Sequence, residues 1–224
     1  MLLKDARKTL AEIELDPPDY VSPETTIYET IRKMQDTKHP AFCVVDEDGN
    51  VQGMVTKSNL STIGLGDTAS GIDLLKETSL DAIAKTINGT IVYRDEDMHI
   101  NGKVSIIALT SSKLDHYEIK DRIVIVGDDS AAQKELIQKG AGILIAVWTK
   151  EIAPEVVETA KQYHCPVILS GHGSMNTSRY IYFAPPVKLV MTKKVILFHT
   201  SDLAEETGRR MMASRYRVYP VVDN

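Results

Sequence analysis

An internal repeat constrains the fold of this 224-residue sequence more than any other feature. The segment K-H-P-A-F-C-V-V-D ends at Asp46 and R-Y-R-V-Y-P-V-V-D ends at Asp223, so the offset in numbering is 223 − 46 = 177. The pairs that this offset aligns include Val21 with Phe198, Thr25 with Asp202, Ile27 with Ala204, and Met34 with Met211. Each copy has the pattern of a short strand, a helix and a second strand. We expect two like units that pack as a pseudo-symmetric pair with a cleft between them.

Composition indicates a soluble, cytoplasmic protein. The net charge of −5 disfavours nucleic acid as a partner, because general nucleic-acid binders carry a basic excess. No apolar stretch approaches the roughly 20 residues that span a bilayer, and the N-terminus lacks the apolar core of a signal peptide, so no membrane association is expected. Cys43 and Cys165 lie in apolar runs, which is typical of buried free thiols in a reducing compartment.

The first copy continues beyond the repeat, because an Asp-Gly turn after Val45 leads to another apolar run. The elements expected here are a strand over 20–21, a helix from Ser22–Thr25 to about Lys38, strands over 41–45 and 51–55, and helices from Thr56 and over 72–87. A lead-in helix over 1–16 is expected to end at Pro17 and Pro18.

The pattern changes between the two copies. Apolar runs at 104–109, 123–126, 143–147 and 167–169 alternate, in their later part, with helical segments at 130–139 and 154–164. Continuous apolar strands separated by helices predict βαβ units and a parallel sheet covered on both faces. The expected fold class is therefore α/β: an α+β pair of β-α-β-β-α units with an inserted parallel-sheet domain.

This pattern divides the chain into four expected parts. They are the lead-in helix over 1–16, a first unit over 17–88, an α/β insert over 89–184, and a second unit over 185–224. By the offset, the counterpart of Gly53–Thr56 would lie at 230–233, so the second unit is expected to be incomplete.

The repeat resembles the CBS domain, on the residues V-V-D-E-D-G-N-V-Q-G-M-V-T-K-S-N-L. The order of a CBS unit, an α/β insert, P-P-V-K-L-V-M-T-K-K and a second CBS unit is similar to the regulatory region of family II inorganic pyrophosphatases with CBS and DRTGG domains. Further matching motifs are D-R-I-V-I-V-G-D and S-R-Y-R-V-Y-P-V-V-D. The glycine pair of the DRTGG domain is absent, because W-T-K-E follows Val147. The resemblance therefore does not carry functions of those glycines over to this chain.

The resemblance implies a regulatory region that binds adenine nucleotides in the clefts between CBS units. AMP and ADP would inhibit, and ATP or diadenosine polyphosphates such as diadenosine tetraphosphate would activate. The implied partners are a second copy, joined through CBS and DRTGG-like domains, and the catalytic pyrophosphatase domains of the parent chain. Those catalytic domains hold Mn²⁺ or Co²⁺ on paired aspartates and histidines that include D-H-H. This sequence has no such motif, so no catalytic residue and no metal site are expected in it.

Thr56, Lys57, Ser58 and Asn59 follow a buried strand and are expected to begin a helix. A phosphate could bind there, because first-turn N–H groups lack intrahelical partners and the helix dipole favours an anion. Thr56 and Asn59 share a face and could bind ribose hydroxyls, while Lys57 supplies a positive charge. The alternative is that Thr56 only caps the helix and that Lys57 and Asn59 are solvated. The resemblance favours nucleotide binding.

Arg215, Tyr216 and Tyr219 lie between the second helix and its V-V-D strand, in a segment expected to face the cleft. Arginine binds phosphate in bidentate fashion, and a base stacked on tyrosine gains on the order of 1–3 kcal/mol. The alternative is a surface basic pair, Arg215 and Arg217, with Tyr219 in the core. Family members use an arginine–tyrosine pair here, which implies binding by Arg215 and Tyr216. Tyr219 stays a candidate, although its place before a proline in a strand favours a structural role.

Two other functions compete with nucleotide sensing. If the chain is a ligand-free dimerisation or interaction module, Arg215→Ala and Asn59→Ala should leave its behaviour unchanged. An enzyme built on the central α/β domain would need a reactive group at the strand ends, and the sequence offers no nucleophile, base and orienting residue in a recognisable arrangement.

Overall fold

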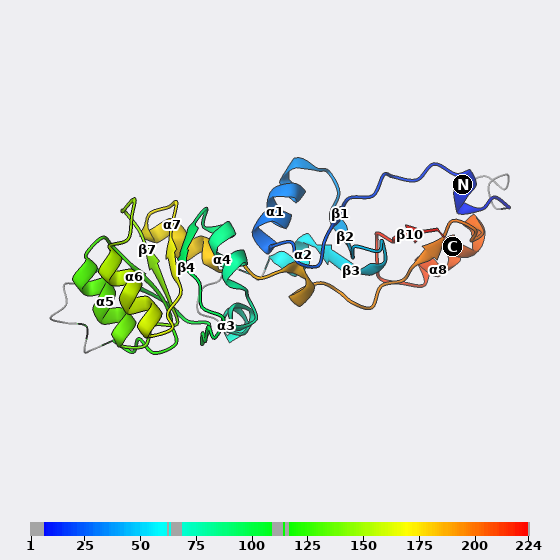
Figure 1. Ribbon diagram of the computed structural model, residues 1–224. Coiled ribbons are helices and arrows are strands. Elements are labelled where there is room, and N and C mark those ends of the chain that lie inside the picture. Colours follow the sequence, from blue (N-terminus) through cyan, green and yellow to red (C-terminus); the bar gives the residue numbers. More distant parts are fainter. Residues whose placement is uncertain (1–6, 62, 64–68, 109–113, 115–116, 224) are drawn as a thin grey trace.

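The computed structural model describes residues 7–61, 63, 69–108, 114 and 117–223. Figure 1 shows an elongated molecule with the central α/β domain at one end and the first unit next to it. The second unit lies at the other end, where the N-terminal segment runs beside it. The mixed α/β architecture expected from the sequence is confirmed.

The first unit is a three-stranded sheet whose hairpin is preceded along the chain by one helix and followed by another, and the two helices share one apolar cluster. Its elements are β1 (Tyr20–Val21), α1 (Ile27–Asp36), β2 (Ala41–Val45), β3 (Val51–Thr56) and α2 (Lys57–Leu60). β1 pairs parallel with β2, and β3 pairs antiparallel with β2. Helix α1 begins later than expected, because Thr26 and Glu29 form a capping box and Ser22–Thr25 forms a turn instead.

The second unit repeats the first in register. It consists of β9 (Phe198–His199), α8 (Ala204–Met212) and β10 (Val221–Val222). Phe198 pairs with Val221 as Val21 pairs with Val44, and the two pairs are related by the same offset, since 198 − 21 = 221 − 44. Helices α1 and α8 also begin at equivalent residues, since 204 − 177 = 27. The repeat read from the sequence is therefore a repeat of structure.

The expected lead-in helix over 1–16 is wrong for the described residues 7–16. Only a single 3-10 turn forms, η1 (Leu10–Glu12), and the chain is extended from Ile13. The N–H groups of Leu10 and Ala11 donate to Asp202 and Thr200 of the second unit, both at 2.9 Å. These bonds replace intrahelical bonds and dock the segment against the second unit.

The central domain has a five-stranded sheet in the order β4-β8-β7-β6-β5. The four apolar runs are its parallel strands, namely β5 (Val104–Ile107), β6 (Ile123–Val126), β7 (Ile143–Ala146) and β8 (Val167–Leu169). Leu109, expected at the end of β5, lies outside the described residues. β4 (Thr90–Tyr93) was not expected; it is an antiparallel edge strand of alternating exposure with a bulge before Tyr93.

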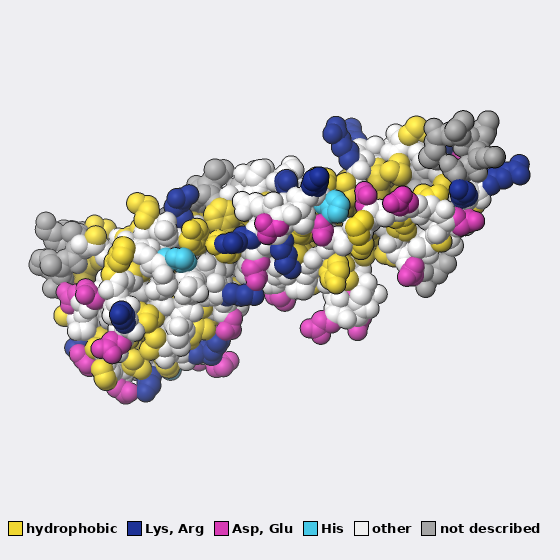
Figure 2. Space-filling model, turned by 90° about the horizontal axis from the view of Figure 1, so that it is seen from above, with side chains coloured by type: hydrophobic (Ala, Val, Ile, Leu, Met, Phe, Trp, Pro, Cys, Tyr) yellow, Lys and Arg dark blue, Asp and Glu magenta, His cyan; other side chains and the backbone are white. Residues whose placement is uncertain are grey.

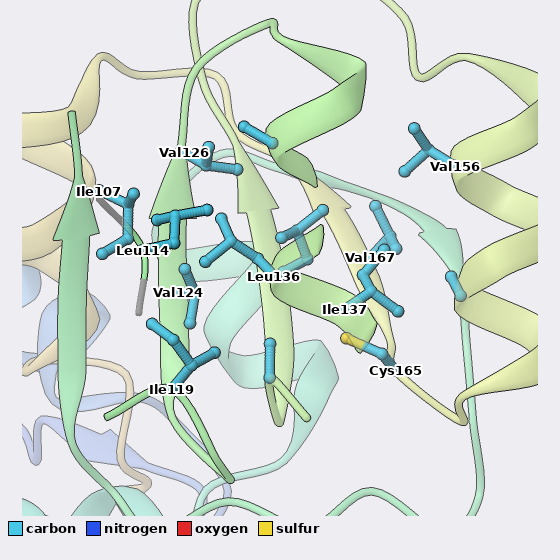
Figure 3. Packing of buried hydrophobic residues seen from close by; sticks show 14 residues of the cluster. Ile107, Leu114, Ile119, Val124, Val126, Leu136, Ile137, Val156, Cys165 and Val167 are labelled. Carbon is cyan, nitrogen blue, oxygen red and sulfur yellow. The ribbon is translucent and has the colours of Figure 1, made fainter. Parts of the chain in front are cut away.

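Helices cover both faces of this sheet. On one face, shown in Figure 3, α5 (Ser130–Gln138) and α6 (Pro154–Gln162) pack Leu136 and Val156 against Val124 and Val167. The other face is covered by α3 (Ala69–Lys76), α4 (Leu80–Thr86) and α7 (Ser174–Ile181). The single helix expected over 72–87 is two helices, because Ser79 accepts the Ala82 N–H and begins α4.

The apolar residues of α3 and α4 belong to the central core and not to the first unit. Leu75, Leu80 and Ile83 are buried with Ile125 and Ile145 of the sheet. The expected boundary at residues 88/89 stays a prediction, and this packing is the observation that bears on it.

A short joint connects the central domain to the first unit. The N–H groups of Ile27 and Tyr28, at the start of α1, donate to Pro185 and Phe183, at 2.9 and 2.8 Å. The Tyr28 and Tyr180 rings meet edge-on, with their centroids 5.4 Å apart. These contacts fix α1 to the chain that leaves α7.

The surface has no large field of one charge on the face seen in Figure 2, where acidic and basic side chains are interspersed. In the described part of the chain, no helix is both long enough and apolar enough to cross a membrane.

Candidate functional site

A pocket of about 280 Å³ lies between the two units. It is lined by Pro40 and Ala41 of the first unit, by Met54, Thr56, Lys57 and Ser58 around the start of α2, by Thr192, Val195 and Ile196, and by Tyr216, Arg217, Val218 and Tyr219. The described lining residues carry two cations, Lys57 and Arg217, and no carboxylate. The pocket therefore favours an anionic ligand.

The start of α2 is fixed by a reciprocal capping box. Thr56 Oγ1 accepts the Asn59 N–H at 3.2 Å, and Asn59 Oδ1 accepts the Thr56 N–H at 2.9 Å and the Thr56 hydroxyl at 2.8 Å. The box turns the chain sharply from β3 into α2, which leaves Lys57 and Ser58 at the wall of the pocket. Thr56 therefore caps the helix, and the same turn places its neighbours at the pocket.

Gly53 lets the chain of the second unit cross β3 closely. Met54 and Thr192 exchange backbone hydrogen bonds of 3.0 and 2.8 Å. A Cβ atom on Gly53 would lie 2.6 Å from the carbonyl oxygen of Thr192, which is closer than real Cβ contacts. Only glycine fits this crossing, and the crossing carries Thr192, Val195 and Ile196 to the pocket.

The opposite wall is the segment between α8 and β10. The Tyr219 ring packs on buried Phe198 at a centroid distance of 5.4 Å, and the Tyr216 ring stands edge-on to Tyr219 at 6.4 Å. The Tyr219 hydroxyl donates to the carbonyl of Tyr216 at 2.7 Å. Tyr216 is about half exposed, so its ring remains accessible to a ligand.

The pocket brings together five of the seven predicted site residues, namely Thr56, Lys57, Ser58, Tyr216 and Tyr219. Asn59 and Arg215 do not line it. Asn59 uses its side-chain oxygen in the capping box, and Arg215 lies exposed one position before the lining segment.

Arg217, which the alternative interpretation pairs with Arg215 at the surface, lines the pocket, whereas Arg215 does not. The repeat relates it to a residue on the opposite wall of the pocket. The offset places Arg217 on Pro40 and Val218 on Ala41, and all four residues line the pocket. Equivalent positions of the two units thus face one ligand space.

Among the described residues, no group of three or more His, Cys, Asp or Glu side chains could hold a metal ion. His164, which follows α6, bonds the carboxylate of Asp95 at 3.0 Å and does not converge with His172, whose ring packs on Tyr180.

Comparison with known proteins identifies two domains. The CBS-domain model matches residues 10–65, and the DRTGG-domain model matches residues 82–183. The second CBS unit is supported by the structural repeat described above. The CBS match covers the first unit from β1 to α2, and the DRTGG match covers the central domain from α4 to α7, while α3 lies outside both matches.

The chain is similar to two pyrophosphatases. It is 29% identical over 223 residues to the cobalt-dependent inorganic pyrophosphatase of Clostridium perfringens, covering 99% of this chain and 41% of that protein. It is 28% identical over 218 residues to a probable manganese-dependent inorganic pyrophosphatase of Thermotoga maritima, covering 96% of this chain and 39% of that protein. The chain thus spans about two fifths of the length of these relatives.

A solved structure matches nearly the whole chain. It is the regulatory region of the Clostridium perfringens pyrophosphatase, with its CBS and DRTGG domains, in complex with the activator diadenosine tetraphosphate. The TM-score is 0.85 at 29% identity, and the match covers 96% of this chain and 95% of that one. The chain therefore combines CBS and DRTGG domains in an arrangement that resembles the regulatory region of this family II pyrophosphatase.

Proposed function

We propose that this chain is a cytoplasmic, adenine-nucleotide-binding regulatory region that controls an inorganic pyrophosphatase. The observation that carries the proposal is the pocket between the two CBS units, which is lined by Lys57, Arg217 and Tyr216 together. Two cations without a carboxylate suit phosphates, and a half-exposed aromatic ring suits a base. A relative with the same domains binds diadenosine tetraphosphate, which contains both groups.

Eight of the lining residues have a distinct role in this proposal. Lys57 and Arg217 neutralise the phosphates, and Arg217 can do so through two parallel hydrogen bonds. The Ser58 hydroxyl bonds a phosphate or ribose oxygen, whereas the Thr56 hydroxyl, whose proton goes to Asn59 Oδ1, is left to accept from a ribose hydroxyl. Tyr216 packs on the adenine ring, and the apolar side chains of Met54, Val195 and Ile196 cover the rest of it.

Regulation follows if the ligand binds two conformations of the chain unequally, since a ligand shifts an equilibrium only by its difference in affinity. We propose a homodimer held through its CBS and DRTGG domains, with the pyrophosphatase catalytic domains as the regulated partner. A dinucleotide that reaches two symmetric pockets would brace such a dimer, whereas AMP or ADP would fill each pocket separately. Opposite effects, inhibition by AMP or ADP and activation by ATP or diadenosine polyphosphates, would then arise from one site. Any Mn²⁺ would belong to the catalytic domains.

Titration calorimetry with AMP, ATP and diadenosine tetraphosphate tests the proposal, with thermal unfolding in parallel. A ligand at about 100 times its dissociation constant should add roughly 2.7 kcal/mol to the free energy of unfolding. We expect saturable binding, with one dinucleotide per two chains. A folded chain that shows neither heat nor a shift in unfolding temperature would favour the alternative, a dimerisation module without a ligand.

A further inference from the structure

Two hydroxyl groups hold the backbone of Tyr216 from both sides. The Tyr219 hydroxyl donates to the Tyr216 carbonyl at 2.7 Å, and Ser214 Oγ accepts the Tyr216 N–H at 3.3 Å. The hydroxyls of Ser214 and Tyr219 also bond each other. Ser214 and Tyr219 therefore form a closed clip around the one residue between them that offers an aromatic ring to the pocket.

The first unit lacks this clip at the equivalent positions. The offset of 177 places Ser214 on Thr37, Tyr219 on Phe42 and Tyr216 on His39. Phe42 has no hydroxyl, and Thr37 Oγ1 is a buried oxygen with no hydrogen-bond partner in the structure. The two units share a backbone repeat but differ in how they hold this segment.

His39 is instead fixed by a carboxylate, since its Nδ1 lies 2.5 Å from Asp19 Oδ2. The second-unit counterpart of Asp19 is Ile196, which cannot make such a bond and lines the pocket. The second unit thus leaves the pocket wall apolar at this position and holds Tyr216 through its backbone. This arrangement keeps a carboxylate away from the site proposed for phosphate.

Phe42 also shows that the fold does not require the hydroxyl of Tyr219. Phe42 is buried in the core of the first unit, where it packs as Tyr219 packs on Phe198 in the second. The aromatic ring is therefore common to both units, whereas the hydroxyl occurs only in the second unit, where it bonds the backbone of the pocket-lining Tyr216.

We propose that Ser214 and Tyr219 are positioning residues that preorganise Tyr216 and Arg217 for the nucleotide. The inference rests on the proposed function of the pocket. Residues 215–218 are exposed, so without the clip they would sample other conformations and would have to be ordered when the ligand binds. The clip removes that cost and so raises affinity through the order of this segment, because its hydroxyls bond each other and the Tyr216 backbone.

Three single substitutions and one double substitution test this role. Tyr219→Phe and Ser214→Ala each remove one hydroxyl, whereas Ser214→Thr keeps it and copies the residue of the first unit. The dissociation constant for AMP is measured by calorimetry, and the unfolding temperature of the free chain is measured for each variant. We expect roughly three- to tenfold weaker binding for Tyr219→Phe and Ser214→Ala, the range set by loss of one or two neutral hydrogen bonds. Ser214→Thr should bind nearly as the unaltered chain does.

The double substitution Ser214→Ala with Tyr219→Phe should weaken binding less than the product of the two single effects, because the hydroxyls act as one unit. Hydrogen exchange in the peptide covering 213–219 should be faster in both single-hydroxyl deletions. If the unaltered chain binds AMP and both deletions bind it equally well, the positioning role is overturned while the nucleotide function stands. Equal weakening by Ser214→Thr and Ser214→Ala would assign the effect to packing and would also reject it. Failure of the unaltered chain to bind any of the three nucleotides would reject both proposals.

Discussion

Leu10 and Val187 are equivalent positions of the repeat, since 187 − 10 = 177. Leu10 precedes the first unit but contacts the second, whereas Val187 precedes the second strand-helix-strand repeat but contacts the first unit. The Leu10 N–H donates to Asp202 in the second unit, and the Val187 N–H donates to Thr25 in the first, both at 2.9 Å. Each residue begins a 3-10 turn, η1 or η3 (Val187–Leu189), with the same three-residue length. The segment that leads into each unit therefore packs on the other unit, and these two exchanged contacts tie the pair together.

This exchange predicts that Leu10 stabilises the second unit, from which it is separated in sequence by the whole first unit and the central domain. Leu10 is 4% exposed and shares a small core with Phe198 and Ala204. We expect Leu10→Ala to lower the free energy of unfolding by about 2–3 kcal/mol, because it removes buried apolar surface and leaves a cavity. Urea unfolding followed by circular dichroism measures the loss. Leu15→Ala, at a position 41% exposed, is the control and should change stability by less than about 0.5 kcal/mol.

A matched pair of glycines separates close packing from intrinsic helix propensity. Gly53→Ala should disrupt the crossing at Thr192 and weaken nucleotide binding, because its Cβ would meet a backbone carbonyl at 2.6 Å. Gly208→Ala should raise the free energy of unfolding by up to about 1 kcal/mol, since Gly208 lies inside α8 and a Cβ there meets nothing within 4 Å. Thermal unfolding of both variants checks the signs. If the Gly53→Ala chain is as stable as the unaltered chain and binds nucleotide normally, the close approach of Thr192 does not require glycine at position 53.

The sequence was sufficient to predict elements whose periodicity is set by their own residues. The buried run from Ile123 to Val126 and the repeat from Val21 to Asp46 needed no tertiary information. The prediction of a lead-in helix was wrong because N–H groups of this segment donate to the second unit. A local sequence pattern contains no information about an acceptor so distant along the chain. Strand β4 was missed for a related reason: as an edge strand of alternating exposure it lacks a continuous apolar run.

The same limit explains the arginine in the site. Arg215 and Arg217 are indistinguishable as residue types, and their order on the wall depends on how Ser214 and Tyr219 bend the segment. The offset aligns Arg217 with Pro40, so the repeat favours Arg217 over Arg215 as a lining residue once Pro40 is known to line the pocket. That position is a property of the packed pair and not of either copy.

Both cysteines should react slowly with thiol reagents in the folded chain. Burial raises the pKa of the Cys165 thiol to about 12, and partial burial raises the pKa of Cys43 above its usual value. At pH 8 the Cys165 thiol is therefore far less ionised than a thiol of ordinary pKa, and the thiolate is the form that reacts. We expect Cys43 to react first, with Cys165 modified only after unfolding in urea. Rapid modification of both at pH 8 would show that the central sheet opens easily.

The raised pKa of Cys165 also sets the sign of a pH effect on stability. A thiol whose pKa is raised by folding stabilises the folded state fully below its unfolded pKa, near 8.5, and that stabilisation is lost as the pH rises toward about 12. The free energy of unfolding should therefore fall more steeply above pH 9 in the unaltered chain than in Cys165→Ala. Parallel slopes for the two chains between pH 9 and 11 would reject this assignment.

Arg217 and Arg215 offer the sharpest test of the pocket, because they are two positions apart and carry the same charge. Arg217→Ala should weaken binding of AMP by roughly ten- to a hundredfold, since a charge-assisted hydrogen bond to phosphate contributes about 1.5–3 kcal/mol. Arg215→Ala changes the net charge equally but removes no lining residue, so its dissociation constant should stay within about twofold. Calorimetry at two salt concentrations separates the contact from general attraction, which weakens in both chains as salt rises. The reverse order of effects would place Arg215 on the ligand and would require the segment from Ser214 to Tyr219 to turn over when the nucleotide binds.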